Sequence, residues 1–228
     1  MKQILFSLFG LIALSSCAPD TKNTTITIEV KGLKKGNLYL QKLTESGLLN
    51  LDSVQANGTS TYSLGHNLSQ PELLYAYLDK NDGSEFNDRI PFFAEPGNIH
   101  IETELNAFEN KAVITAGSEQ TEFEKVQQML SKFATKDFEL LQLSQSEKAK
   151  NQKFVDSLIE ASNTNNLRRY QFIVNYALTH PENYVAAYLI AEEGDELTPK
   201  WRDSIFNSFS EDIKNSSFGQ KINSQLSQ

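Results

Sequence analysis

The sequence has little of what most redox, metal and nucleic-acid sites require. It contains one cysteine in 228 residues, which excludes an internal disulfide, a CxxC redox pair and a multi-cysteine metal site within this sequence. Basic residues number 21 against 29 acidic ones and form no concentrated basic run, so we expect no nucleic-acid partner. No GxSxG, P-loop or GxGxxG motif is present. The composition is that of a globular protein without a recognisable catalytic signature.

The histidines and paired carboxylates also predict no reactive site. His66, His100 and His180 lie far apart with no HxH or HxxxH spacing, so no zinc site is expected. Glu102 and Glu104 share one face of a predicted strand, as a glycosidase pair would, but a solvated strand face is much commoner. We therefore predict no catalytic residue, no metal and no cofactor, and interpret the chain as a protein that is not an enzyme.

Two acidic stretches could be mistaken for cation sites. Residues 79–85 resemble a calcium loop, but the glycine falls at the fifth position and Ile90 stands where glutamate is needed at the twelfth. A hairpin turn is the better interpretation. Residues 192–196 place four carboxylates near a predicted helix end, where weak divalent-cation binding is the alternative to a solvated loop.

The N-terminus is the most informative part of the sequence. Lys2 precedes an apolar run over residues 4–14, which would span roughly 16 Å as a helix, about half of a ~30 Å hydrocarbon core. The run is therefore typical of the hydrophobic region of a signal peptide rather than of a membrane span. No other apolar run approaches the length of a membrane-spanning helix, so none is predicted.

A lipidation motif follows the apolar run. Leu14-Ser15-Ser16-Cys17 resembles the bacterial lipobox, in which an aliphatic residue and two small residues precede the cysteine. We expect residues 1–16 to be a signal peptide cleaved between Ser16 and Cys17. The Cys17 thiol would carry diacylglycerol, and in Gram-negative bacteria a further acyl chain such as palmitate would be added to the new amino terminus. The alternative is an ordinary secretory signal in which the cysteine is incidental.

The predicted anchor also suggests a location. Residues 17–23 form a short polar tether, and Ala18, rather than aspartate, follows the cysteine, which resembles outer-membrane sorting. Several acyl chains on Cys17 would hold the protein firmly in a lipid bilayer, since each buried methylene contributes about 0.8 kcal/mol. We expect a lipid-anchored protein of the outer membrane that faces the periplasm, with surface exposure as the alternative.

The body of the sequence has two halves with different periodicities, which predicts an α+β fold. Residues 24–117 alternate apolar and polar side chains with period two, beginning at Ile26 and Ile28. About eight short strands are expected there, forming an antiparallel β-sandwich or barrel. Asn57-Gly58 predicts a tight hairpin between the strands that flank it.

The second half, residues 118–228, is predicted to be a helical domain. Ser118 is the expected N-cap of the first helix. Apolar residues three or four apart, beginning at Phe123, share one face of this helix, and Phe138 and Leu141 extend that stripe, with Leu140 as a further candidate.

Further helices are expected beyond the first. One covers residues 147–178, and the polar stretch 163–166 is a candidate kink in it. His180-Pro181 ends this helix, because proline cannot continue the hydrogen-bond ladder. Shorter helices follow, one of them opened by Thr198-Pro199.

Three short triplets predict a modification. Each consists of aspartate, serine and an aliphatic residue, and resembles the acceptor of some periplasmic O-glycosylation systems. The candidate acceptors are Ser53, Ser157 and Ser204. Such triplets also arise by chance, and that alternative remains open.

The order of motifs resembles a known bacterial arrangement. In TlpA-like thiol–disulfide oxidoreductases, a lipobox, a β-domain of unknown function and a helical segment precede a thioredoxin domain. The matching segments here are residues 52–58, 95–99 and 180–188, with the sequences DSVQANG, EPGNI and HPENYVAAY.

The resemblance does not carry the redox activity to this chain. A thioredoxin domain needs on the order of a hundred residues, and only two residues follow Leu226. We expect a binding or scaffolding module whose partner is an envelope protein. The alternative is an accessory subunit that acts in trans with a separate thioredoxin-like protein.

The lipid anchor gives the first prediction. Replacing Cys17 with serine removes the only thiol that can take diacylglycerol, so Cys17→Ser should abolish labelling of the protein by a clickable fatty acid in cells. Gel fluorescence of the tagged chain measures this. Labelling that persists in Cys17→Ser would rule out the anchor.

Overall fold

The computed structural model describes residues 22–44, 46–83, 88–194 and 197–227. The expected signal peptide and the expected cleavage and lipidation residues Ser16 and Cys17 lie outside the described residues. Within the described ranges, no helix combines the length and apolarity needed to cross a bilayer.

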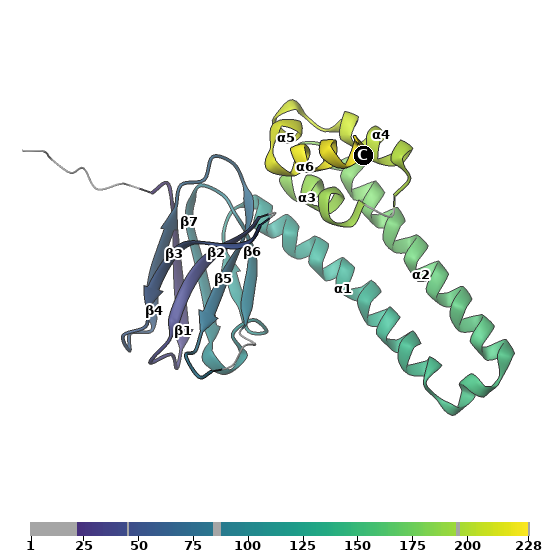
Figure 1. The fold of residues 1–228 in the computed structure, drawn as a ribbon, viewed down its shortest axis with the longest axis horizontal. Coiled ribbons are helices and arrows are strands. Elements are labelled where there is room, and N and C mark those ends of the chain that lie inside the picture. The colour runs from purple at the N-terminus through teal and green to yellow at the C-terminus, as the bar shows by residue number, and fades with distance from the viewer. Residues whose placement is uncertain (1–21, 45, 84–87, 195–196, 228) are drawn as a thin grey trace, which may run out of the picture.

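The first half of the chain is a sandwich of two four-stranded sheets (Figure 1). The first sheet has the order β4-β1-β7-β8, formed by Thr61–His66, Thr24–Lys31, Gly97–Glu104 and Val113–Thr115. The second has the order β3-β2-β5-β6, formed by Gly47–Gln55, Asn37–Thr44, Glu72–Asp79 and Arg89–Ala94. A short 3-10 helix, Leu105–Ala107, precedes β8. The predicted α+β class and eight-stranded β-domain are confirmed, and the sandwich is the form it takes.

The sandwich core follows from the alternation of the strands. Ile26, Ile28 and Val30 of β1 are fully buried, while the polar residues between them face outward. Because successive side chains of a strand point to opposite faces, each sheet contributes one apolar face to the core. Phe92 of β6 and Phe108 fill the interior as its largest buried side chains.

Two pairings differ from the expected pattern. Asn57-Gly58 does not form a hairpin, because β3 and β4 belong to different sheets and the segment between them crosses the sandwich. In addition, β1 pairs with β7 in parallel, within sheets whose other pairs are antiparallel. The alternation of apolar residues in β4 predicts which face of the strand is buried. It does not predict which strand pairs with β4. The connection from β5 to β6 does join antiparallel partners, as expected for a hairpin at residues 79–85.

Asp52 links the two sheets at the edge formed by β3 and β4. Its carboxylate accepts hydrogen bonds from the Lys22 ammonium at 2.7 Å and from the backbone N–H groups of Gly65 and Ser53, both at 2.9 Å. Burial opposes ionisation of this carboxyl. The hydrogen bonds from Lys22, Gly65 and Ser53, with the charge of Lys22, outweigh the burial and lower the pKa of Asp52.

We expect Asp52→Asn to lower the free energy of unfolding by about 1 kcal/mol at neutral pH, since the site is partly exposed. Because folding lowers the pKa of Asp52, its contribution is present above the ordinary aspartate value of about 4. The contribution is lost as the pH falls through the folded-state value. Urea unfolding at neutral and acidic pH measures the difference. Ser53→Ala keeps its backbone N–H and is the control; an equal loss there would contradict the assignment.

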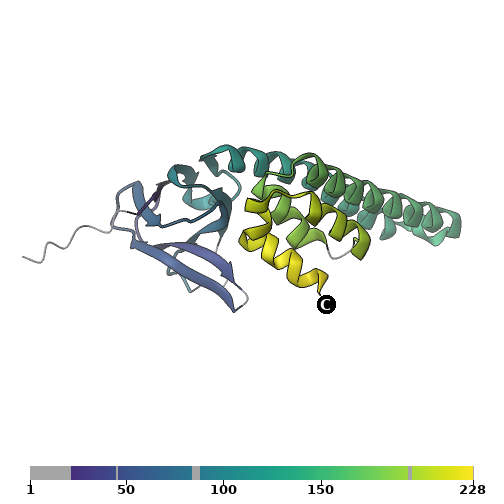
Figure 2. The same ribbon diagram turned by 90° about the horizontal axis from the view of Figure 1, so that it is seen from above.

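Where the structure describes it, the second half folds into six α-helices. Figure 2 shows this helical half from a second direction. α1 and α2, Ser118–Ser144 and Gln152–Thr179, form a long antiparallel pair, the helical hairpin, whose tip projects away from the rest of the molecule. The 3-10 helix Glu147–Lys150 joins them. The shorter helices α3, α4, α5 and α6 are Tyr184–Glu193, Pro199–Ser208, Glu211–Asn215 and Ser217–Leu226. They pack at the base of the hairpin around a second apolar core.

Three expectations about these helices are wrong in detail. α2 runs unbroken through residues 163–166, because the Asn165 amide donates to the Phe133 carbonyl at 3.0 Å and to Asp137 Oδ1 at 2.8 Å across the hairpin. On α1, Leu140 is buried while Phe138 and Leu141 are exposed, since residues on the side of Leu140 face α2. The side chain of Ser118 does not cap α1.

The acceptor at the start of α1 comes instead from the sandwich. Glu95, in the turn between β6 and β7, accepts the Glu119 N–H through Oε2 at 2.9 Å. Glu119 in turn accepts the N–H of Val185, in the first turn of α3, at 3.1 Å. Gln120 Oε1 accepts the Phe93 N–H of edge strand β6 at 2.7 Å. These three contacts, here called the junction, connect the sheet to the helices.

The junction gives a pH-dependent prediction. Burial raises the pKa of Glu119, and nearby Glu95 and Glu122 add to the rise, although the backbone N–H groups of Val185 and Tyr184 oppose it. With a raised folded-state pKa, the stability linked to Glu119 is fully present below the ordinary glutamate value of about 4.3. It is lost as the pH rises through the folded-state value.

Glu119→Gln keeps an oxygen acceptor for the Val185 N–H but cannot ionise. The variant should therefore gain stability relative to the natural chain as the pH rises from about 4 to about 8. Urea unfolding across this range measures the change, with Glu109→Gln, an exposed loop residue, as the control. Parallel pH profiles for the natural chain and Glu119→Gln would contradict the prediction.

Candidate functional site

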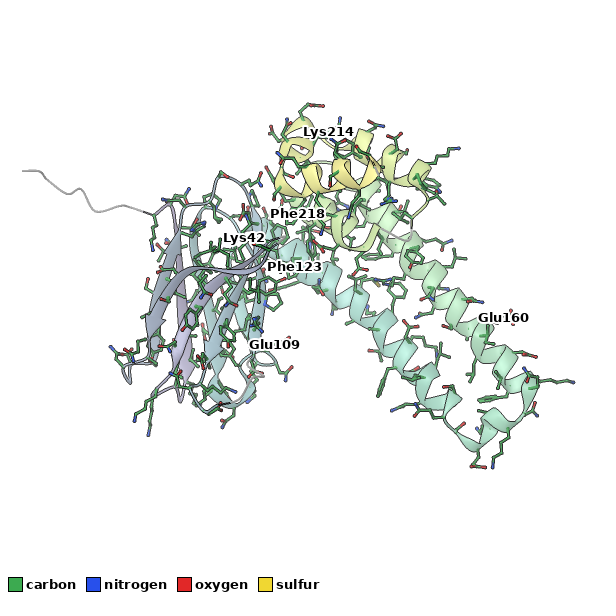
Figure 3. The ribbon with its side chains drawn as sticks, in the orientation of Figure 1. Lys42, Glu109, Phe123, Glu160, Lys214 and Phe218 are labelled. Carbon is green, nitrogen blue, oxygen red and sulfur yellow. The ribbon has the colours of Figure 1, made fainter. Side chains whose placement is uncertain are left out.

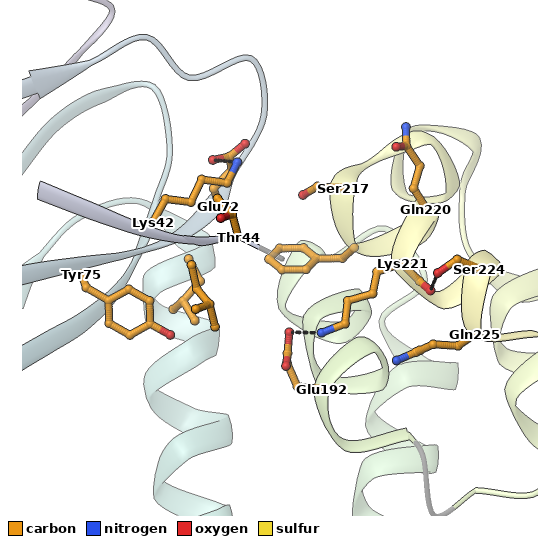
Figure 4. A pocket seen from close by; sticks show the side chains of 13 residues that line it. Lys42, Thr44, Glu72, Tyr75, Glu192, Ser217, Gln220, Lys221, Ser224 and Gln225 are labelled. Carbon is orange, nitrogen blue, oxygen red and sulfur yellow. Dashed lines mark hydrogen bonds and ion pairs between the residues drawn. The ribbon is translucent and has the colours of Figure 1, made fainter. Parts of the chain in front are cut away.

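A hollow lies where the second sheet meets the short helices (Figure 4). Its volume is about 600 Å³. One wall comes from β2 and β5, and the other from the end of α3 and from α6. We call it the interface cleft. Its lining residues are Lys42, Leu43, Thr44, Glu72, Leu73, Tyr75, Glu192, Ser217, Phe218, Gln220, Lys221, Ser224 and Gln225.

The sheet wall carries one ion pair. The ammonium of Lys42, near the end of β2, lies 2.7 Å from Oε2 of Glu72, the first residue of β5. The Glu72 side chain is 11% exposed, so its charge needs a nearby cation to offset the cost of leaving water. Lys42 provides that cation and remains accessible from the cleft, at 31% exposure.

The helix wall carries a second ion pair and a spare acceptor. Lys221 of α6 lies 2.9 Å from Oε1 of Glu192 on α3. Gln225, one helical turn after Lys221, donates through Nε2 to the Ala191 carbonyl at 3.2 Å. Its Oε1 is buried and has no hydrogen-bond partner among the described residues. A buried acceptor of this kind favours a ligand that brings an N–H or O–H group.

Two aromatic residues line the cleft. Phe218 of α6 (Figure 3) has its ring centroid 5.8 Å from that of Phe93 and 5.6 Å from that of Tyr188. Tyr75 of β5 lines the opposite wall. Burial, together with the charge of Glu192, raises the pKa of Tyr75, so its hydroxyl stays protonated at neutral pH and can donate a hydrogen bond.

The charges of the cleft cancel locally. Each lysine on its walls is paired with a glutamate, so a strongly charged ligand would have to break an ion pair to enter. Hydroxyl and amide groups from Thr44, Ser217, Ser224 and Gln220 complete the polar lining. This mixture of apolar surface and a few polar groups is typical of a binding site for a small polar molecule or a short peptide.

Sequence patterns did not predict this site. Its residues come from β2, β5, α3 and α6, and only Glu192 lay in a segment singled out from the sequence. That acidic segment is neutralised where the structure describes it, because Glu192 pairs with Lys221 and Glu193 pairs with Arg169. Residues 195–196 lie outside the described residues. The cleft is formed by tertiary contacts between residues far apart in the chain. Such contacts produce no recognisable spacing in the sequence.

The other predicted residues are scattered. Ser53, Ser157 and Ser204 are each exposed, on β3, α2 and α4, and the structure does not bring them together. At Ser53, the preceding aspartate already has a structural role in joining the sheets.

The histidines and paired acids are also separate from the cleft. Within the described ranges, no group of three or more histidine, cysteine or acidic residues could hold a metal ion. His100 lies 3.3 Å from Glu102, whereas Glu104 pairs with Lys111, and His180 stacks on Tyr176.

Comparison with known families gives a match for the β-half. Residues 24–123 match a family described as a domain of unknown function (DUF4369). The match covers the whole sandwich and ends in the second turn of α1, so it includes all three α1 and β6 residues of the junction, Phe93, Glu119 and Gln120. No curated protein matches the chain.

Proposed function

We propose that this chain is a lipid-anchored binding module of the bacterial envelope that holds its ligand in the interface cleft. The observation that carries the proposal is the cleft itself, a hollow of about 600 Å³ with an aromatic residue on each wall and a buried, unused acceptor at Gln225. Cavities of roughly 300–1,000 Å³ with a few convergent polar groups are the usual form of a ligand site.

The polar groups of the cleft favour recognition over catalysis. A general acid or base works best when its pKa lies near the operating pH. The carboxylates of Glu72 and Glu192 each contact a lysine of the same wall, and burial together with the charge of Glu192 raises the pKa of Tyr75 away from neutrality. Such groups orient a ligand through hydrogen bonds and do not readily exchange protons with it.

The end of the expected tether and the start of the helical half lie at different edges of the sandwich. Lys22, near the end of the expected tether, pairs with Asp52 on the β3–β4 edge, whereas α1 begins against the opposite edge strand β6. A chain held in the outer membrane through acylated Cys17 would therefore present the helices and the cleft away from the tether. This arrangement supports a periplasm-facing module that remains open to its ligand.

Filling the cleft should test the proposal. Ser224 lines the cleft on α6, and the neighbouring Asn223 is exposed and does not line it. Ser224→Trp should fill the hollow and abolish ligand retention, whereas Asn223→Trp adds the same indole elsewhere on the same helix and should leave retention intact.

Native mass spectrometry of the tagged lipoprotein released from its own membranes is the measurement. We expect a non-lipid adduct on the natural chain and on Asn223→Trp that is absent from Ser224→Trp. In-cell crosslinking of the same three proteins extends the comparison to protein partners. Identical adducts and identical crosslinked partners in all three, or none in the natural chain, would contradict the proposal.

A further inference from the structure

The helical hairpin has two different faces, which the grooves between its helices reveal. One groove, here the apolar groove, has a volume of about 610 Å³ and is lined by Asp137, Leu140, Leu141, Ser144, Ala149, Val155, Leu158, Ile159, Ser162 and Asn166. The other, the polar groove, is lined by Lys136, Ser157, Glu160, Ala161, Thr164, Asn165 and Arg168. Both grooves run between the same two helices, so they lie on opposite faces of the hairpin.

The apolar groove exposes large hydrophobic side chains. Leu141 and Ile159, which line it from α1 and α2, are 54% and 55% exposed. Phe138 is 59% exposed and lies three residues before Leu141, on the same side of α1. A concentration of large apolar side chains on one face of a surface helix pair is typical of an interaction surface.

The outer part of the hairpin is also sparsely packed. Beyond Val126, the only buried residue of α1 is Leu140, and α2 contributes only Asn165 before Ile173. Helices of this kind gain most of their stability from burial of an apolar stripe against other elements. Among the described residues, no further helix or strand packs against the projecting tip (Figures 1 and 2).

The charged residues in the lining of the apolar groove bear on which partner could bind there. Asp137 is the one charged residue in its lining, and the Asn165 amide, 2.8 Å away, holds that carboxylate toward α2. A two-fold axis over the groove places the same apolar lining on both sides of the interface, and the single carboxylate that each copy contributes, Asp137, is already held by its own Asn165. We propose that the apolar groove pairs with the same groove of a second copy, so that two hairpins form a four-helix bundle.

The size of the surface sets the strength of this pairing. The ten lining residues with Phe138 are about half of the 20–30 residues that each side of a standard interface uses, so the dimer should be weak and concentration-dependent. Each copy carries a net charge of −8, so screening of this repulsion by salt should strengthen the association. An interface built on ion pairs would respond in the opposite direction.

Sedimentation equilibrium tests the proposal on the chain from residue 17 onward with Cys17→Ser, which retains every described residue. Over about 10 to 500 μM protein, we expect a monomer–dimer equilibrium that shifts toward dimer as salt is raised. Ile159→Glu places a charge in the apolar groove and should weaken dimerisation at least tenfold.

The matched control is Thr164→Glu, which adds the same charge to the same helix in the polar groove and should leave the equilibrium unchanged. Circular dichroism confirms that both variants stay helical; if Ile159→Glu unfolds, Leu141→Gln replaces it. A monomer at all concentrations overturns the proposal. So does equal weakening by Thr164→Glu, or a dimer that Ile159→Glu does not weaken.

Discussion

The hydrogen bonds of the junction are the contacts on which the arrangement of the two halves depends. Glu95, in a turn of the sandwich, accepts a backbone N–H of the first turn of α1. Glu119 on α1 accepts a backbone N–H of the first turn of α3. Helix N-termini need acceptors and favour negative charge, so each carboxylate fixes where a helix begins. Gln120 also covers the free N–H of Phe93 on edge strand β6, which protects the edge from pairing with another chain. The direction of α1 is thereby set by the sheet.

Phe93 shows how one residue then joins two cores. Its neighbour Phe92 fills the sandwich, whereas Phe93 points to the other face of β6 and packs with Phe123, Tyr188 and Phe218. Because this packing brings α6 close to β2 and β5, the interface cleft exists only when the junction is formed. The same geometry directs the helical hairpin away from the sheets and leaves its apolar groove uncovered.

The sequence predicted what depends on local periodicity and missed what depends on partners. Alternation identified the buried residues of β1, and His180-Pro181 marked the end of α2 correctly. The Asn57-Gly58 hairpin was wrong because its signal describes a local turn, while strand neighbours are decided by the packing of whole sheets. Serine is a common N-cap residue, so Ser118 was a reasonable prediction. In the structure, the Glu95 carboxylate of the β-domain accepts the backbone N–H at the start of α1 instead. The cleft left no signal, since its two ion pairs join residues about 30 positions apart in each case.

The three motifs behind the resemblance to TlpA-like proteins make structural contacts here. Asp52 of the first motif ties β3 to β4, and Glu95 of the second caps α1. In the third, His180 stacks on Tyr176, and the Asn183 side chain accepts the Ala186 N–H that opens α3. Within the described chain, none of these residues lines the cleft. The motifs therefore contribute to joining the sandwich to the helices, whereas the ligand proposed for the cleft would contact other residues, such as Lys42, Gln220 and Ser224. A resemblance of this kind is weak evidence for a shared activity.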